Sequence, residues 1–217
     1  MTVVIACAQG TADSGVLDES EGGVDAARDV LVIPDDSATL DNTVPEPDGA
    51  IFDSGTPETS PAAGSVVINE LQSNGPLGAS DEFVELYNRG TAPVTLLNWE
   101  VKYESSGGSP GGAGHKFTTA TVIAPGAYLV LRGATWSSGM AAAAGQVGLL
   151  DDNAKLVDGV GYGAATTNGA YREKAPAPSP PIGGSIGRSP NGVDTKNNAA
   201  DFKAYPTATV SPGAANP

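Results

Sequence analysis

Three short stretches decide the fold class of this chain. They are Ser65-Val-Val-Ile-Asn-Glu-Leu71, Asp81-Glu-Phe-Val-Glu-Leu-Tyr-Asn-Arg-Gly90 and Val94-Thr-Leu-Leu-Asn-Trp-Glu-Val-Lys-Tyr103. In each stretch apolar residues alternate with polar ones or form a short run, and Gly, Asn or Asp bounds the run. This pattern is typical of β-strands.

Similar runs continue through the rest of the chain. The expected strands cover residues 66–71, 83–87, 94–97, 99–103, 116–123, 127–132, 146–150, 156–162, 185–188 and 201–205. The glycine-rich residues 107–114 are expected to form a loop, and Asp151-Asp-Asn-Ala154 the tip of a hairpin. Short strands separated by turn residues predict an all-β antiparallel sandwich or barrel.

The charge of the chain divides it into two parts. Residues 1–64 hold 13 of the 25 acidic side chains and one of the 11 basic ones, a net of −12, which leaves −2 for residues 65–217. The first part has a single aromatic residue, Phe52, so it cannot bury enough apolar surface to offset the entropy of ordering. We therefore predict a disordered acidic linker over residues 8–64 and one domain over residues 65–217.

Composition also argues against several kinds of partner. An acidic chain with scattered Lys and Arg does not favour a nucleic-acid partner, which is held through a clustered basic face. A single cysteine, Cys7, excludes an internal disulfide framework and a cysteine-based zinc site. No cofactor is expected, and the absence of a long apolar run predicts no transmembrane helix.

The first seven residues end in Val4-Ile-Ala-Cys7, which resembles a bacterial lipobox and makes Cys7 a candidate for lipidation. The apolar stretch before it is shorter than a signal peptide requires, so this interpretation places the true start upstream. It predicts a cell-envelope or extracellular location, with outer-membrane sorting in a Gram-negative cell because Ala8 follows the cysteine. If Met1 is the true start and no signal exists, the location is cytoplasmic and Cys7 is a free thiol.

Several motifs together resemble a lamin-tail domain. They are Glu85-Leu-Tyr-Asn88 followed by Gly90, Leu97-Asn-Trp99, Ala124-Pro-Gly-Ala-Tyr-Leu-Val-Leu131, Val157-Asp158 before Tyr162, Ser185-Ile-Gly-Arg188 and Ser211-Pro-Gly-Ala-Ala-Asn216. They occur in the family's order and span residues 66–216. The resemblance implies a two-sheet immunoglobulin-like sandwich, with Glu70, Glu85, Asn88, Trp99 and Arg188 as mostly structural signature residues.

The same resemblance implies a non-catalytic binding, tethering or structural module at the cell surface. Its ligand is expected to be an envelope or extracellular protein or glycan, and the sequence does not identify it further. Similar bacterial domains often occur beside hydrolases, so an accessory domain of a separate secreted hydrolase is the first alternative. A calcium-dependent adhesin is the second.

Two motifs suggest chemistry but favour a structural interpretation. Gly183-Gly-Ser-Ile-Gly187 has the spacing of a nucleophile elbow, yet no helix follows, so neither Ser185 nor the single histidine, His115, is predicted to be catalytic. The loop from Asp194 to Asp201 could supply calcium ligands, of which about six to eight are needed. Lys196 stands where another oxygen ligand is required, which favours Asx side chains capping their own loop and no metal site.

Charged and aromatic residues within the strands allow further predictions. Arg188 is expected to form a structural ion pair with Glu70 or Glu85, the alternative being an acidic ligand-binding spot. By the two-residue period of a strand, Trp99 should share a core-facing side with Leu97 and Val101. Trp136 should lie in a loop, as a candidate for surface contact.

Overall fold

The computed structural model describes residues 64–137 and 139–217, which lie in the second of two units, Ser54–Pro217. The expectations for Cys7 and for the linker up to residue 63 concern residues outside this part. Among the described residues, no helix has the length and apolar character to cross a membrane.

The described residues form mainly antiparallel β-strands and one short helix, α1 (Asn198–Asp201). The strands are β1 (Val66–Gln72), β2 (Phe83–Asn88), β3 (Val94–Thr95), β4 (Glu100–Ser105), β5 (Pro110–Lys116), β6 (Val122–Ile123), β7 (Tyr128–Arg132), β8 (Gly145–Leu150), β9 (Leu156–Tyr162), β10 (Ser185–Arg188) and β11 (Phe202–Tyr205). Three single 3-10 turns, η1 (Ala79–Asp81), η2 (Gly133–Thr135) and η3 (Thr207–Thr209), lie between or after them.

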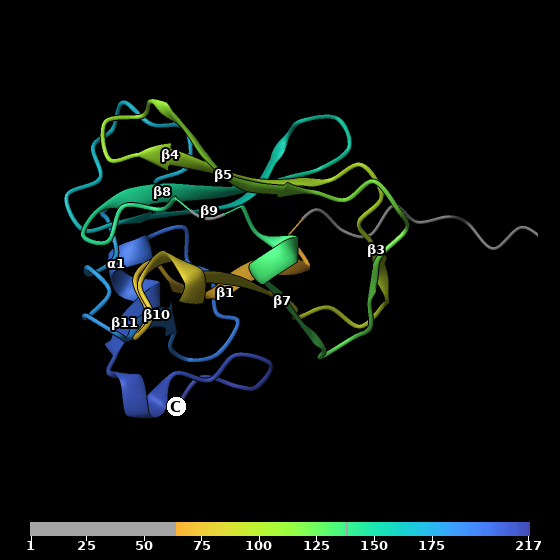
Figure 1. Cartoon of the computed structure of the whole chain (residues 1–217). Helices are drawn as coiled ribbons and strands as arrows, with labels where there is room; N and C mark the ends of the chain where they lie inside the picture. The colour runs from red at the N-terminus through yellow and green to blue at the C-terminus, as the bar shows by residue number, and fades with distance from the viewer. Residues whose placement is uncertain (1–63, 138) are drawn as a thin grey trace, which may run out of the picture. The chain divides into compact units, whose positions relative to one another are not determined.

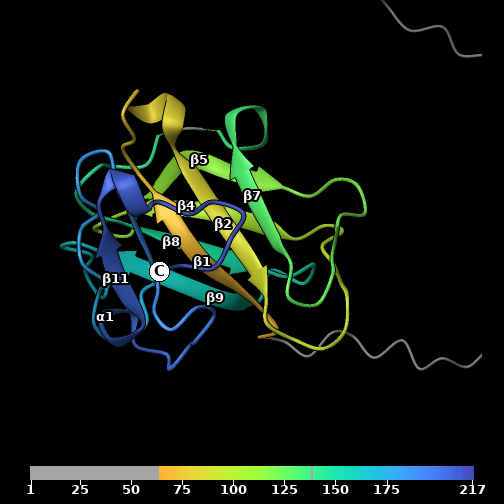
Figure 2. The same cartoon turned by 90° about the horizontal axis from the view of Figure 1, so that it is seen from below.

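Two sheets pack face to face, as Figures 1 and 2 show. One sheet has the order β11-β10-β1-β2-β7 and the other β5-β4-β8-β9, while β3 and β6 form a separate ribbon. This arrangement is an immunoglobulin-like sandwich, and the predicted fold class is confirmed.

The core lies between the two sheets. Ile68 and Leu86 from one sheet and Val101 and Leu149 from the other are fully or almost fully buried in one apolar cluster. Burial of such side chains contributes roughly 1.5–3 kcal/mol each. Trp99 belongs to the same cluster with 8% of its surface exposed, as expected.

Strand β1 is buried on both faces. It lies in the middle of its sheet, paired with β2 on one side and β10 on the other. A β-bulge between Ile68 and Glu70 changes its alternation, so that Asn69 and Glu70 both leave the core while Leu71 returns to it. The bulge therefore places two polar side chains side by side on the outer face.

Two details differ from the sequence expectation. The glycine-rich residues expected to form a loop include most of strand β5, whose Gly111 packs directly against the ring of Tyr103 and leaves no room for a side chain. Leu97 is exposed rather than in the core, because Asn98 has a positive φ of 64° and interrupts the alternation between Leu96 and Trp99.

Candidate functional site

Arg188 joins the two sheets. It is fully buried on β10, and its guanidinium lies 2.9 Å from both carboxylate oxygens of Asp158 on β9 and 3.2 Å from Asp201 Oδ2. Its Nε donates to the Ile68 carbonyl, and its charge lies 4.7 Å from the centre of the Phe202 ring. Nη2 makes both contacts to Asp158, while Nη1 and Nε bond Asp201 and the Ile68 carbonyl, so the planar guanidinium serves three groups at once as a lysine ammonium could not.

The predicted pairing of Arg188 with Glu70 or Glu85 is wrong. Glu70 is the cross-strand partner of Gly187, so its side chain lies on the sheet face opposite to that of Arg188. The alternation of side chains in a strand thus separates the arginine from both glutamates.

The loop from Asp194 to Asp201 is capped by its own side chains. Asp201 accepts hydrogen bonds from the backbone N–H and the hydroxyl of Thr195. Asn198 accepts from the N–H groups of Gly161 and Glu173, and its amide donates to the Gly159 carbonyl. Asp201 thus caps its own loop, as the sequence favours, whereas Asn198 ties the loop to β9 and to Glu173.

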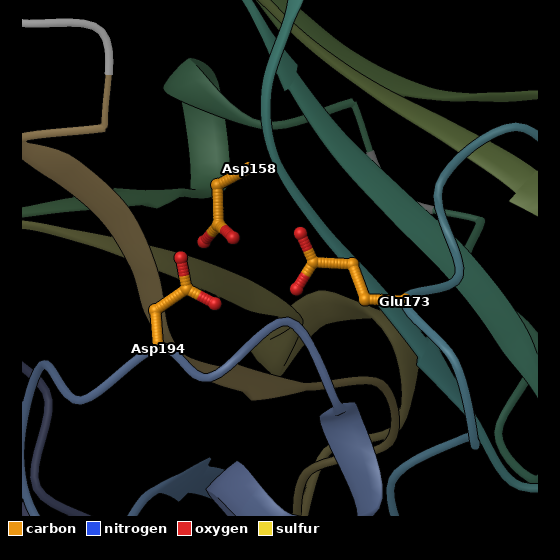
Figure 3. A group of neighbouring side chains, drawn as sticks. All are labelled: Asp158, Glu173 and Asp194. Carbon is orange, nitrogen blue, oxygen red and sulfur yellow. The ribbon is translucent and has the colours of Figure 1, made fainter.

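Asp158, Glu173 and Asp194 bring three carboxylates together, and Figure 3 shows them pointing toward one another. Their oxygens lie within 4.8 Å of one another, as in a site for a hard cation. However, the Lys196 ammonium lies 2.9 Å from Asp194 Oδ2, 3.0 Å from Glu173 Oε1 and 3.9 Å from Asp158 Oδ1. The positive charge of this cluster is therefore supplied by the chain itself.

Glu173 and Asp194 both contact the Lys196 ammonium, but their pKa values shift in opposite directions. Burial, together with the nearby Asp158, raises the pKa of Glu173 to about 7 although Lys196 opposes the shift. Burial also pushes the pKa of Asp194 upward, but the bonds from Lys196 and the charge of Arg188 overcome this effect and hold it below the ordinary value. The pKa of Lys196 is raised, because Asp194 and Glu173 outweigh the effect of its burial.

Glu70 and Glu85 form a second group of buried carboxylates, a pair on the outer face of the five-stranded sheet. They are cross-strand partners on β1 and β2, and both side chains are fully buried. Glu70 accepts from the Ser185 hydroxyl and from the N–H and hydroxyl of Ser211, while Glu85 accepts from the Asn69 amide and the Gly213 N–H. The C-terminal segment 211–217 thus covers the pair.

These two carboxyl groups have raised pKa values. Burial raises the pKa of Glu70, and it raises that of Glu85 to about 7, with the Glu70 charge contributing in the same direction. Only neutral N–H and O–H groups donate to either carboxylate among the described residues. These hydrogen bonds lower the pKa of each carboxyl group but only partly oppose burial, which favours the protonated form.

Asn216 attaches the rest of the C-terminal segment. Its side-chain amide donates to the carbonyls of Asn69 on β1 and Arg188 on β10, and it lies directly over Gly187. A side chain at Gly187 would occupy the same space. The outer face of β1 is therefore filled by the chain's own end.

Asn88 holds a turn and the β3–β6 ribbon. Its amide donates to the carbonyls of Ala92 and Ile123, and its oxygen accepts from the Gly90 N–H. Ser185 and His115 do not meet, because Ser185 donates to Glu70 on β1 whereas His115 lies on β5 of the other sheet against the Phe117 ring.

Trp136 is buried, with 3% of its surface exposed, so its predicted surface position is wrong. The turn η2 returns the chain to the core, and the indole Nε1 donates to Glu82 Oε2 at 3.3 Å. Glu82 also accepts from the N–H groups of Gly139 and Met140. Sequence reasoning missed Glu82, since one acidic residue before a strand carries no signal of burial.

The comparison with known families agrees with this geometry. Residues 59–164 match the family model described as Lamin Tail Domain, which covers β1 to β9. No curated protein matches the chain. Strands β10 and β11 complete the same five-stranded sheet beyond the matched residues. The chain contains a lamin tail domain, matched over residues 59–164.

Proposed function

We propose that this chain is a non-catalytic binding and tethering module of the cell surface. In this proposal Cys7 carries a lipid anchor, the acidic residues 8–64 act as a spacer, and the sandwich presents a surface to an envelope or extracellular protein or glycan. The family match and the division of charge along the sequence support the proposal.

The position of β1 in its sheet is the observation that best supports the tethering role. The chain enters the sandwich at Ser65 and continues directly into β1, which has hydrogen-bonded neighbours on both sides. In antiparallel pairs these bonds lie across the strand direction, so a pull along β1 loads many of them together. Such a strand resists a pulling force that is applied through the N-terminus of the domain.

The use of the polar groups supports a non-catalytic role. A pair of carboxylates that works as acid and base must reach a substrate. Here Glu70 and Glu85 are covered by the C-terminal segment, and Lys196 lies among Asp158, Glu173 and Asp194. Both groups of carboxylates hold parts of the chain in place.

The anchoring part of the proposal is tested by expressing the full chain with its native upstream sequence in a bacterial host. The protein should partition into detergent, and Cys7→Ser should release it into the aqueous phase. Recovery of the unmodified Cys7 thiol from the cytosol would contradict the proposal.

The binding part is tested with an array of glycans and envelope fractions probed with the full chain. Saturable binding that survives removal of the lipid is the expected result. Retention of a secreted hydrolase, without binding to any envelope component, would instead favour the accessory role.

A further inference from the structure

The two larger sheets end in four edge strands: β11 and β7 in one, β5 and β9 in the other. An edge strand presents unpaired backbone groups to any other extended chain, and proteins protect such edges with lysine, proline, bulges or covering segments. The four edges of this sandwich differ in that protection.

Three edges are protected. Asn198 and Ala177 bond to the outer side of β9 at Gly159 and Gly161, and Ser137 pairs with Gly114 of β5. The remaining protected edge, β11, carries the exposed Lys203 and ends before Pro206.

Strand β7 lacks such protection along most of its length. Its register with β2 directs the backbone groups of Leu129 and Leu131 toward β2, so those of Tyr128, Val130 and Arg132 point away from the sheet. The Thr135 hydroxyl bonds both backbone groups of Arg132. For Tyr128 and Val130, neither backbone group has a partner within residues 64–137 and 139–217.

We propose that β7 pairs with β7 of a second copy of this chain, antiparallel about a twofold axis at Leu129. In this register Tyr128 of each copy lies opposite Val130 of the other, and their free N–H and C=O groups form four hydrogen bonds. The two Leu129 side chains, each half-buried at the edge of the core, then cover one another. The five-stranded sheets of the two copies become one continuous sheet.

The strand favours its own copy because it is self-complementary. Residues 128–131 carry no charge, so the two paired strands themselves add no charge repulsion. An aromatic side chain opposite a β-branched one is a stabilising cross-strand pair, and the twofold axis produces it twice. Because only two residues per strand are free, the contact is small and belongs with weak, transient interfaces below about 1,200 Å².

Sedimentation of the full chain between about 10 μM and about 1 mM tests the proposal, since weak association falls in this range. The protein carries Cys7→Ser to exclude disulfide dimers. Val130→Pro removes an outward N–H without touching the β2 ladder, because proline is tolerated at such edge positions. Two of the four bonds disappear, which should weaken dimerisation roughly 25-fold, a factor of about five for each bond.

Ala204→Pro is the matched control, because Ala204 is an exposed residue on β11 whose N–H also points away from its sheet. This variant should dimerise like the parent protein. A monomer throughout the concentration range, or equal effects of the two prolines, would overturn the proposal.

Disulfide trapping tests the register separately. Leu129→Cys should form a symmetric disulfide under mild oxidation, since directly opposed residues have Cα atoms about 4.5 Å apart. Val130→Cys should not, because the two copies of that residue are offset by more than about 7 Å. Failure of the Leu129 variant to cross-link, or faster cross-linking of the Val130 variant, would contradict pairing through β7.

Discussion

Two buried groups of carboxylates in this domain are held in opposite ways. In the Arg188 cluster, defined by Arg188, Asp158, Asp194, Lys196 and Asp201, each carboxylate faces a cation. In the glutamate pair, Glu70 and Glu85, the described donors are neutral N–H and O–H groups.

The difference determines how each group responds to pH. The pKa of Asp194 is held below its ordinary value, whereas that of Glu85 rises to about 7. Asp194 should therefore stay charged at neutral pH, while Glu85 titrates there. Burial still raises the pKa of Asp158 despite Arg188 and that of Glu173 despite Lys196, so burial and partner together decide the charge of a carboxylate.

Replacing Arg188 should lower the free energy of unfolding most. Arg188→Met leaves Asp158 and Asp201 buried without their cation, which should lower the free energy of unfolding by about 3–5 kcal/mol. This is a large part of a small domain's stability. Denaturant unfolding followed by circular dichroism measures it.

Arg89→Met is the matched control for this change. Arg89 and Arg188 lie at similar distances from Asp194, 3.6 and 3.5 Å, but the Arg89 side chain is 34% exposed. Its loss should cost about 1 kcal/mol or less. Equal losses at the two arginines would mean that burial of the ion pair is not what matters.

Another buried carboxylate, Glu82, extends the comparison, because its described donors are also neutral. Trp136→Phe removes the indole N–H that donates to Glu82 and should cost about 1–3 kcal/mol. Trp99→Phe makes the same change in ring size at an indole that donates to no described residue. Stability measurements should find the larger loss at Trp136, and the reverse order would show that its bond to Glu82 contributes nothing.

The pH dependence of stability tests the glutamate pair. The folded-state pKa of Glu85, about 7, exceeds the ordinary 4.5, so its contribution is fully present below about pH 4.5 and is lost as the pH rises through 7. Glu85→Gln should remove this loss, which is on the order of 2–3 kcal/mol between pH 5 and pH 8.

Glu173 and His115 contribute alike in the two proteins, whereas Glu70 is coupled to Glu85, so the difference reports the titration of the pair. Unfolding midpoints measured across this range provide the comparison. Parallel pH profiles of the parent protein and the variant would show that Glu85 has an ordinary pKa.

Replacing Lys196 should change the free energy of unfolding least. Lys196 is 58% exposed, so Lys196→Met should cost about 1 kcal/mol or less at pH 8. In the parent protein its ammonium supplies the charge that a metal would bring, and neither calcium nor a chelator should change the thermal midpoint. A calcium-dependent rise of several degrees would show that a bound ion displaces Lys196.

Much of the fold follows from alternation along the sequence. Strands β1, β2, β8, β9 and β10 lie within one or two residues of their expected positions. The hairpin tip also forms as predicted, with Asp151 Oδ1 accepting from the N–H groups of Asn153 and Lys155. Local chemistry is sufficient in these places.

Strand β5 and Leu97 could not be predicted in this way. The glycines of β5 lack the apolar side chains that mark a strand, and they suit this position because Tyr103 fills the space above Gly111. A single positive φ at Asn98 moved Leu97 to the surface. The first outcome depends on a contact between two strands, and the second on the conformation of one residue.

The sequence predicted an ion pair at Arg188 but not the residues that form it. A buried ion pair at Arg188 was expected, yet its partners depend on which face of β10 it occupies. Asp158 lies in the opposite sheet and Asp201 in α1, so only the assembled sandwich brings them to the arginine. The C-terminal cover over Glu70 and Glu85 is likewise set by the fold, because Ser211 is 141 residues from Glu70.

Carboxyl titration by nuclear magnetic resonance tests the contrast between the two groups most directly. With side-chain carboxyl carbons labelled, Glu85 should titrate at about 7 and Asp194 below its ordinary value of 3.8. If both groups titrate at their ordinary values, the division into a cation-held cluster and a neutral-donor pair is wrong.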